Sequence, residues 1–476
     1  MLRPTRKADN SQVKTEEAAI PVATRLWRRF GDRDVTSHGL GLLALRSATM
    51  GAKFALTLFI TKYMGLADLG TYGIVTSLTA LAPVLLGFGV SNHLGREATR
   101  EGPAGVCTRL VQYFFFVVQT YAALLALAML AFPDHARALA LLCGVLILEH
   151  LQTDLLLVMA LTDRAYAAQV VNFVRSAGWM LVYAPLALSD PKLRTLEALG
   201  VFWLAGLVVA TILTVAVTRH WRWAAALRAA PRGRPPLPHR HGSTALYLND
   251  VANTAFQYVD RYVVGIFLSP AALGVYVLFW SITNALNNLI ATALVPTRRR
   301  LLQVNDASPM EFDGELRRVT LAATLMTVVL GLLAVGFVYI VAPLLGRPEI
   351  IPHLPLMFLL CAALVARTIY EALGIAFYAR RRDDLTLYSG VIILVLSLGL
   401  NLGLDPYFGI AGASVVLLAS YSVGIVARQV IISRGFKPHA GAAATVQAMA
   451  AGPGLRAGRR SVVMPKPGPP VAQDRP

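Results

Sequence analysis

Long apolar runs, each bounded by charged residues, glycine or proline, recur along the chain from about residue 43 to about residue 432. A helix that crosses a bilayer needs about 20 predominantly apolar residues, because the lipid offers no partners for backbone groups. Runs of this length predict an all-α polytopic membrane protein with about 12 transmembrane helices. The predicted spans are 43–63, 71–92, 108–131, 137–160, 165–187, 196–217, 244–268, 271–296, 318–343, 352–378, 385–403 and 408–432.

Polar segments separate these runs into larger parts. The first 39 residues are mostly polar, with a short amphipathic stretch at 21–36, and a basic, proline-rich stretch follows the sixth predicted span. The C-terminal residues are rich in Gly, Ala, Pro and Arg, a composition that favours disorder. We therefore predict a cytoplasmic tail (1–39), an N-terminal six-helix bundle (40–217), a cytoplasmic linker (218–243), a C-terminal six-helix bundle (244–433) and a disordered cytoplasmic tail (434–476).

Composition and charge sharpen this prediction. Of the 476 residues, 56% are hydrophobic and only 15% are charged, whereas soluble domains carry about 25% charged residues. The net charge of +18 comes from arginines and lysines that concentrate in alternate loops. Because basic residues favour the cytoplasmic side, both termini are predicted to be cytoplasmic. The arginines lie in separate short loops without interleaved stacking aromatics, which argues against nucleic acid as a partner.

Two distant segments share a short sequence pattern. Residues 69–79 and 273–283 both read LGxYxxxxSxT, and each copy begins just after a tight turn between two predicted spans. The spacing between the copies equals six predicted spans, so both run in the same direction through the membrane. Parallel repeats of this kind commonly frame a central substrate path.

The segment at 69–100 and the segment NDVANTAFQYVDRYVVGIFLSPAALGVY at 249–276 resemble the second and the seventh to eighth helices of polysaccharide-export flippases. Over 40–432 the chain is similar to Wzx-type O-antigen and exopolysaccharide flippases of the multidrug/oligosaccharidyl-lipid/polysaccharide (MATE-like) superfamily. The resemblance implies two six-helix bundles around a central cavity that works by alternating access. It also implies a polyprenyl-pyrophosphate-linked glycan (on undecaprenol) as substrate, a bacterial inner membrane, membrane lipid around the carrier tail, and a polysaccharide polymerase and assembly proteins as partners.

Ionisable and amide side chains inside predicted spans give the candidate site, because such groups are costly in lipid and usually face an interior. A cation without an acid on its own helix needs another partner, and an anionic headgroup would be one. Ion pairs that fix helix packing are the alternative, for which Arg367 and Glu371, one turn apart, are the best case. The predicted substrate-binding residues are Arg46, Lys53, Arg175, Asn253, Gln257, Arg261 and Arg367.

Carboxylates inside the spans are candidates for binding a coupling ion, H⁺ or Na⁺. The chain has no GxxxxGK[ST] segment, so transport would draw on an ion gradient or on onward consumption of the product. No cysteines and histidines have metal-ligand spacing, and we predict neither a metal nor a cofactor nor enzymatic activity. The candidate ion-coupling residues are Glu149, Asp250, Asp260 and Glu371.

Two other functions remain open. A multidrug or organic-cation exporter would have the same fold, but its pocket should be acidic, whereas several candidate residues here are cations. A membrane-bound polysaccharide polymerase or ligase would need a substantial outer loop to hold its acceptor, and the predicted outer connections are short.

Overall fold

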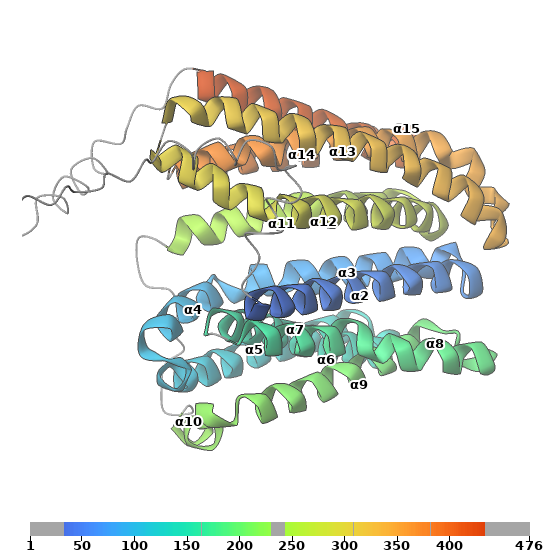
Figure 1. Ribbon diagram of the computed structural model, residues 1–476. Helices are drawn as coiled ribbons and strands as arrows, with labels where there is room; N and C mark the ends of the chain where they lie inside the picture. Colours follow the sequence, from blue (N-terminus) through green and yellow to red (C-terminus); the bar gives the residue numbers. More distant parts are fainter. Residues whose placement is uncertain (1–32, 163, 230–242, 308, 381, 434–476) are drawn as a thin grey trace, which may run out of the picture. The chain divides into compact units, whose positions relative to one another are not determined.

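The computed structural model describes residues 33–162, 164–229, 243–307, 309–380 and 382–433, and the regular elements within these ranges are helices (Figure 1). The chain divides into two compact units, 1–428 and 429–476, and the following account concerns the first. The helices are α2 (Arg33–Tyr63), α3 (Leu66–Gly87), α4 (Val90–Glu101), α5 (Pro103–Ala131), α6 (Ala136–Leu161), α7 (Ala165–Phe173), α8 (Trp179–Ser189), α9 (Leu196–Val217), α10 (Trp223–Ala229), α11 (Ser243–Phe267), α12 (Pro270–Ala307), α13 (Pro309–Leu344), α14 (Leu354–Ala379) and α15 (Asp383–Ser433).

Nine helical segments in the described ranges are long and apolar enough to cross a membrane, which confirms the all-α polytopic class. The other predicted spans are also helical. The spans at 385–403 and 408–432 both lie in α15, the span at 165–187 comprises α7 and α8 with a π-helical turn between them, and the polar span at 244–268 is α11. The predicted amphipathic stretch at 21–36 falls largely outside the described residues, as do residues 230–242 of the linker and the whole C-terminal tail. The first half of the linker contains the helices η5 (Arg219–Trp221) and α10.

Two predicted boundaries were wrong. The link between the last two spans was placed at 404–406, but the helix continues through Pro406 and its only non-helical residue is Gly409, with φ 60° and ψ −145°. The second span was expected to run to residue 92, but α3 ends at Gly87. Phe88 and Gly89 both adopt left-handed backbone conformations there, and α4 begins after them. These two residues change the direction of the chain within a stretch that hydropathy alone shows as continuously apolar.

The two copies of the repeated pattern contact each other at the crossing of α3 and α12. A Cβ atom at Gly70 would overlap the carbonyl oxygen of Pro270, and one at Gly274 would overlap that of Leu66. Only glycine lets two helix backbones approach so closely. The repeat therefore builds a close backbone contact between α3 and α12.

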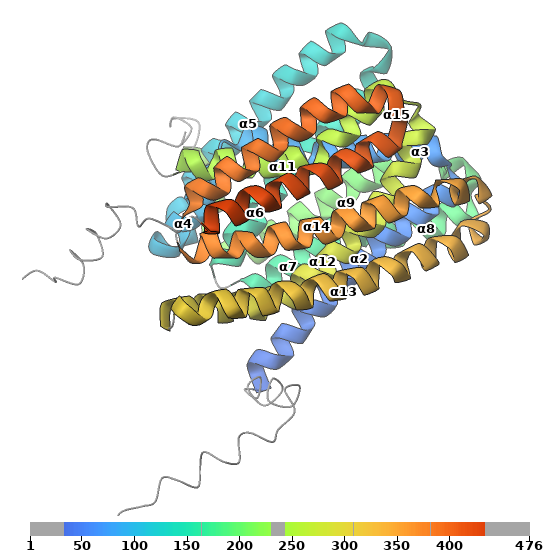
Figure 2. The ribbon, with the colours of Figure 1, turned by 90° about the horizontal axis from the view of Figure 1, so that it is seen from above.

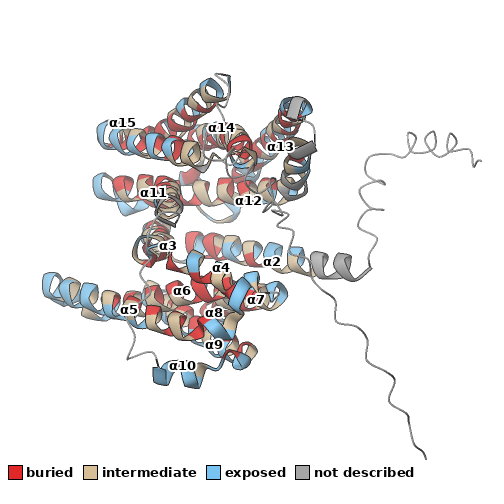
Figure 3. Cartoon of the chain, turned by 90° about the vertical axis from the view of Figure 1, so that its left-hand side faces the viewer, coloured by how far each residue is buried: buried red, intermediate tan, exposed pale blue. Residues whose placement is uncertain are grey.

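Further hydrogen bonds join the helices on either side of this crossing. At the end where α3 and α12 begin, Arg347 Nε donates to Thr61 O at 3.0 Å and Lys62 Nζ to Leu344 O at 3.4 Å. At the opposite end of α3, Tyr247 donates to a main-chain carbonyl of that helix, and the Asn92 amide donates to Asp250 at 3.1 Å. Buried apolar residues from α2, α3, α6, α8, α9 and α11–α14 fill the space between. Figure 3 shows the exposed residues along the outer sides of α5 and α13, as lipid-facing helices require.

Candidate functional site

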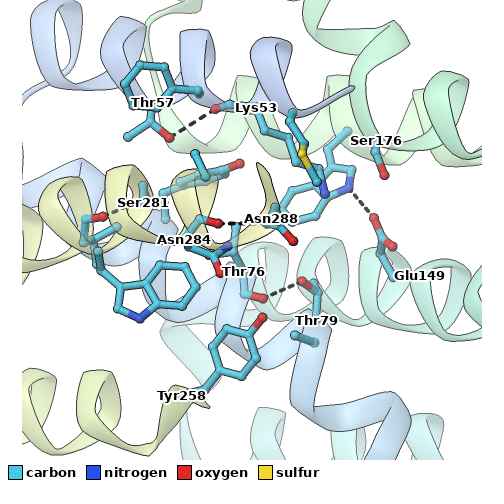
Figure 4. Close-up of a pocket in the computed structure, with 18 of the residues that line it drawn as sticks. Lys53, Thr57, Thr76, Thr79, Glu149, Ser176, Tyr258, Ser281, Asn284 and Asn288 are labelled. Carbon is cyan, nitrogen blue, oxygen red and sulfur yellow. Dashed lines mark hydrogen bonds between the residues drawn. The ribbon is translucent and has the colours of Figure 1, made fainter. Parts of the chain in front are cut away.

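A cavity of about 350 Å³ lies between α2, α3, α6, α9, α11 and α12 (Figure 4). Its wall carries three cations and one acid among the described residues, so the cavity has a positive excess. Its charged lining residues are Lys53, Glu149, Arg175 and Arg261; its hydroxyl and amide residues are Thr57, Thr76, Thr79, Thr153, Ser176, Ser281, Asn284 and Asn288; and its aromatic residues are Phe54, Tyr72, Trp179, Trp203, Tyr258 and Trp280.

The acid of the wall, Glu149 on α6, is held from two sides. Arg175 Nε lies 3.3 Å from Glu149 Oε2, and Trp203 Nε1 donates to Glu149 Oε1 at 2.9 Å. Arg175 also donates from Nη1 to Thr153 Oγ1 at 3.0 Å. A buried carboxylate needs such a cation and such donors to offset its lost hydration. This proposed ion-coupling residue is thus already neutralised by Arg175.

Arg175 owes its position to an irregular turn. Residues Val174–Gly178 form a π-helical turn between α7 and α8, and the proline at 185 lies further along. A π-turn adds one residue to the helical repeat and rotates the following side chains, and such turns are frequent at functional sites. Sequence patterning could not reveal this turn.

Lys53 on α2 lines the same cavity from a different wall than Glu149 (Figure 4). Its side chain is exposed to the cavity, and it lies close enough to Glu149 and Arg175 to interact with both charges. Among the described residues no salt bridge within 4 Å engages its ammonium. Lys53 is therefore available to an anion in the cavity.

Arg261 on α11 is the most deeply buried cation of the wall, with 2% of its surface exposed. Its guanidinium lies 3.6 Å from the ring centre of Trp280 and 4.9 Å from that of Tyr258, and Nη1 donates to Ser77 Oγ at 2.7 Å. Neither Nε nor Nη2 has a hydrogen-bond partner among the described residues. Buried charged donors rarely stay unpaired, so an acceptor that reached these two nitrogens after a shift of the neighbouring side chains would be bound strongly.

A polar strip of α12 completes the cavity wall. Asn284 and Asn288 face it one helical turn apart, with Asn288 Nδ2 donating to Asn284 O at 3.0 Å (Figure 4). Thr76 and Thr79 of α3 contribute hydroxyl groups. These donors and acceptors suit hydroxyl-rich ligands. The neighbouring Asn287 lies on another face and lines a small pocket beside Glu371.

Four of the seven predicted substrate-binding residues do not line this cavity. Arg46 is exposed on α2, beyond the cavity's end, and the Asn253 side chain lies next to Gly390 of α15. Gln257 and Arg367 line a separate, small pocket. Within the described residues the structure thus brings together Lys53, Arg175 and Arg261 but not the full predicted set.

The small pocket is nevertheless adjacent to the main cavity, because Trp280 and Asn284 line both. Arg367 Nε lies 2.7 Å from Glu371 Oε1, so these two residues form the same-helix ion pair considered as the structural alternative. Paired in this way, Arg367 has less of its charge free for a ligand than Arg261 has.

A buried acidic site lies behind Arg261. Asp260 accepts hydrogen bonds from the Tyr276 hydroxyl and from the Arg261 main-chain nitrogen. Asp405 of α15 has no exposed surface, its charge interacts with that of Asp260, and neither of its carboxylate oxygens has a hydrogen-bond partner among the described residues. Asn401, one turn earlier, also has an unpartnered buried oxygen. Asp405 was not among the predicted site residues, because Pro406 placed it in a predicted link between two helices.

No protein-family model matches the chain. A probable flippase, AglR, from Haloferax volcanii is 27% identical over 203 residues, which cover 39% of this chain and 41% of that protein. The match therefore spans less than half of the relative's length.

Solved structures match over most of the chain. A multidrug resistance MATE family transporter in its inward-facing conformation has a TM-score of 0.60 at 16% identity, covering 81% of this chain and 95% of that one. The lipid II flippase MurJ has a TM-score of 0.57 at 10% identity, covering 84% and 87%. A transporter from Pyrococcus furiosus, described as having a binding pocket of reverse polarity that suggests a different function, has a TM-score of 0.50 at 13% identity, covering 83% and 95%. The chain is therefore a polytopic membrane protein with a MATE-like fold, which the matched multidrug transporter and lipid II flippase share.

Proposed function

We propose that the protein is a lipid-linked oligosaccharide flippase, which moves an undecaprenyl-pyrophosphate-linked glycan across the bacterial inner membrane by alternating access. The observation that carries this proposal is the cavity's cationic wall, above all Arg261, whose buried guanidinium has two nitrogens free for an acceptor. Lys53 adds positive charge from α2, while Arg175 lines the wall from the π-turn as the partner of Glu149. A diphosphate is the part of the substrate that cannot enter hydrocarbon, and these cations would offset its lost hydration.

The rest of the cavity suits the rest of the headgroup. Hydroxyl and amide groups from α3 and α12 can exchange hydrogen bonds with sugar hydroxyls. The flat rings of Trp179, Trp203 and Trp280 can pack against the apolar faces of sugar rings. A cavity of this size takes a diphosphate with the first sugar and leaves the remaining glycan to a more open conformation.

A multidrug or organic-cation exporter is the alternative that the fold permits. The aromatic lining would favour it, but the one acid in the lining, Glu149, is neutralised by Arg175. An organic cation entering this cavity would meet Lys53 and Arg261 without a free counter-charge. Electrostatics therefore favours an anionic substrate. A polymerase or ligase is less favoured still, because the matched proteins are named as transporters and flippases.

Location and partners are part of the proposal. The arginine-rich alternate loops support cytoplasmic termini in a bacterial inner membrane. A flippase for surface polysaccharide (O-antigen, capsule or exopolysaccharide) would hand its product to a polysaccharide polymerase and assembly proteins on the outer side.

We further propose that a coupling ion, Na⁺ or H⁺, binds at Asp260 and Asp405. The two acids interact, and both Asp405 oxygens lack partners among the described residues. Asp405→Asn should abolish accumulation driven by an ion gradient while leaving downhill movement intact. A tenfold Na⁺ or H⁺ gradient can drive up to about tenfold accumulation per ion coupled. Accumulation assays in proteoliposomes with each gradient imposed in turn measure the effect, and undiminished accumulation by the variant would exclude Asp405.

The flippase proposal is tested directly by reconstitution. Proteoliposomes holding the full chain should expose a fluorescent undecaprenyl-pyrophosphate-linked N-acetylhexosamine to a membrane-impermeant quencher far faster than empty vesicles do. Lys53→Ala should slow this exposure at least about tenfold, the loss expected for one charge-assisted contact. Arg109→Ala is a matched control, because Arg109 is paired with Glu97 and Glu101 away from the cavity.

An organic cation separates the two transporter functions. Ethidium loaded into the same vesicles should leak no faster with the protein than without it. Protein-dependent ethidium movement, together with no movement of the lipid-linked sugar, would refute the flippase and establish the exporter.

A further inference from the structure

A second hollow, of about 1050 Å³, lies between the first turns of α3, η2 (Pro133–His135), α6 and α9. The residues of its floor are apolar and are buried or half-buried. Charged residues line the hollow only at its rim, where the helices begin. The floor includes Val75, Leu142, Val145 and Leu199, and the charged or titratable residues at its rim are Asp134, His135, Arg137 and Glu197. In Figure 2 the second half of α5 leans away from the neighbouring helices, and Leu127 and Leu130 on it are 64% and 81% exposed.

This groove and the cationic cavity share a wall. Tyr72 and Trp203 line both hollows, with their ring centres 6.2 Å apart. Trp203 also stacks on Trp179 of the cavity, with the ring centres 5.9 Å apart, and its Nε1 donates a hydrogen bond to Glu149. A partition of aromatic rings thus separates an apolar groove from a polar, cationic chamber.

We propose that the groove binds the isoprenoid chain of the substrate while its anionic head lies in the cavity, with Tyr72 and Trp203 between the two. The inference rests on the proposed function, because it assigns one substrate to both hollows. An apolar hollow does not hold water and in a bilayer fills with hydrocarbon, whereas the cationic cavity calls for an anion. An amphiphile with a long chain is the ligand whose two parts match two hollows that share a wall.

The partition is tied to the headgroup site through one acid. Glu149 binds Arg175 with one carboxylate oxygen and Trp203 with the other. A phosphate that bonds to Arg175 competes with Glu149 for it and leaves Trp203 Nε1 as the remaining donor to that carboxylate.

Photo-crosslinking tests the groove directly. Proteoliposomes of the full chain are irradiated with undecaprenyl diphosphate that carries a diazirine at the far end of its isoprenoid chain, and labelled peptides are identified by mass spectrometry. We expect labelling of α6 and α9 around Leu142 and Leu199. Gly200→Leu should reduce it about tenfold, the change expected when about two methylene groups lose their contacts.

The variants are chosen to separate filling from misfolding. A Cβ at Gly200 would already lie 2.7 Å from the Leu141 Cδ2 atom, so Val75→Trp, which narrows the groove from α3, serves as a second filling variant. Gly336→Leu on α13 is the matched control, because a Cβ there meets open space. The filling variants should lose labelling while the control keeps it.

Two labelling patterns would overturn the inference, and so would the absence of groove labelling. One is labelling spread evenly over the lipid-facing helices α5, α13 and α15; the other is equal groove labelling by a phosphatidylglycerol with a diazirine-bearing chain, which would make the groove a site for bulk lipid. Transport without groove labelling would leave the flippase standing and remove only the chain site. Groove labelling without transport would keep the chain-binding groove and refute the flippase.

Discussion

Arg261→Lys is expected to weaken binding of an undecaprenyl diphosphate head about tenfold, and Arg261→Ala about 10- to 100-fold, with transport falling in parallel. Charge-assisted hydrogen bonds contribute about 1.5–3 kcal/mol each, and every 1.4 kcal/mol is a factor of ten. Lysine keeps the charge but loses the planar fork that lies over Trp280 and presents two free nitrogens. The measurement is the Kd for the lipid diphosphate in detergent, together with competition by inorganic pyrophosphate.

The lysine variant is the more informative of the two. Arg261 lies beside Asp260, so alanine would leave a buried acid without its neighbouring cation and could destabilise the fold. Arg428→Lys is the matched control: this guanidinium is also buried, lies 3.4 Å from the Tyr370 ring centre and donates to Ser389, but does not line the cavity. It should lower thermal stability and leave the Kd unchanged. Equal Kd values for Arg261→Lys and the unaltered protein would contradict the role given to Arg261.

Hydropathy predicted the helices well because membrane insertion sets both their length and their composition. It could not predict depth along a helix. Arg46 and Lys53 are seven residues apart and share a helical face, yet about 10 Å of axial rise separates them, and the cavity reaches only Lys53. The spacing of two residues shows that their side chains point in the same direction from the helix axis. Whether both line a cavity also depends on where the neighbouring helices diverge.

Local backbone irregularities explain the other differences. Proline suggested a break beside Asp405, but glycine at 409 supplies the non-helical residue, because it tolerates the positive φ found there. Asp405 is consequently buried beside Asp260 rather than placed in a loop. The π-turn at Arg175 and the buried Arg428, neither of which was predicted, likewise depend on tertiary packing that a linear pattern does not contain. Asn401 and Asp405, one turn apart in an apolar run, were the signal that could have revealed the acidic site.

The two copies of the repeat, taken together, indicated a structural relationship that neither copy alone could indicate. Its glycines were common residues in a short pattern, and only their placement one bundle apart gave them weight. In the structure they meet each other, each beneath the carbonyl oxygen of the residue that begins the other helix. The proposed alternating access requires such a contact to form and to separate, because substrate would leave by the end that the contact closes.

Gly274→Val is accordingly expected to abolish transport, reducing it at least about tenfold, by holding α3 and α12 apart where they begin. Valine is a better helix former than glycine by about 0.5 kcal/mol, so helix propensity would not cause the loss. A Cβ at this position overlaps the Leu66 carbonyl oxygen, and a backbone atom cannot move aside as a flexible side chain can. Gly336→Val, in open space on α13, should transport normally.

The conformational cause can be measured separately from the loss of transport. Spin labels at Lys192 and Glu349, exposed residues beyond α8 and α13 near this end, should report a longer distance in Gly274→Val than in the control. The hydrogen bonds from Arg347 to Thr61 and from Lys62 to Leu344 should be lost in the same state, since they join α13 to α2 beside the crossing. Gly70→Val, the equivalent change in the other copy of the repeat, should give the same longer distance, because its Cβ meets the Pro270 carbonyl oxygen. An unchanged label distance in both variants would show that the crossing tolerates a side chain and does not control closure.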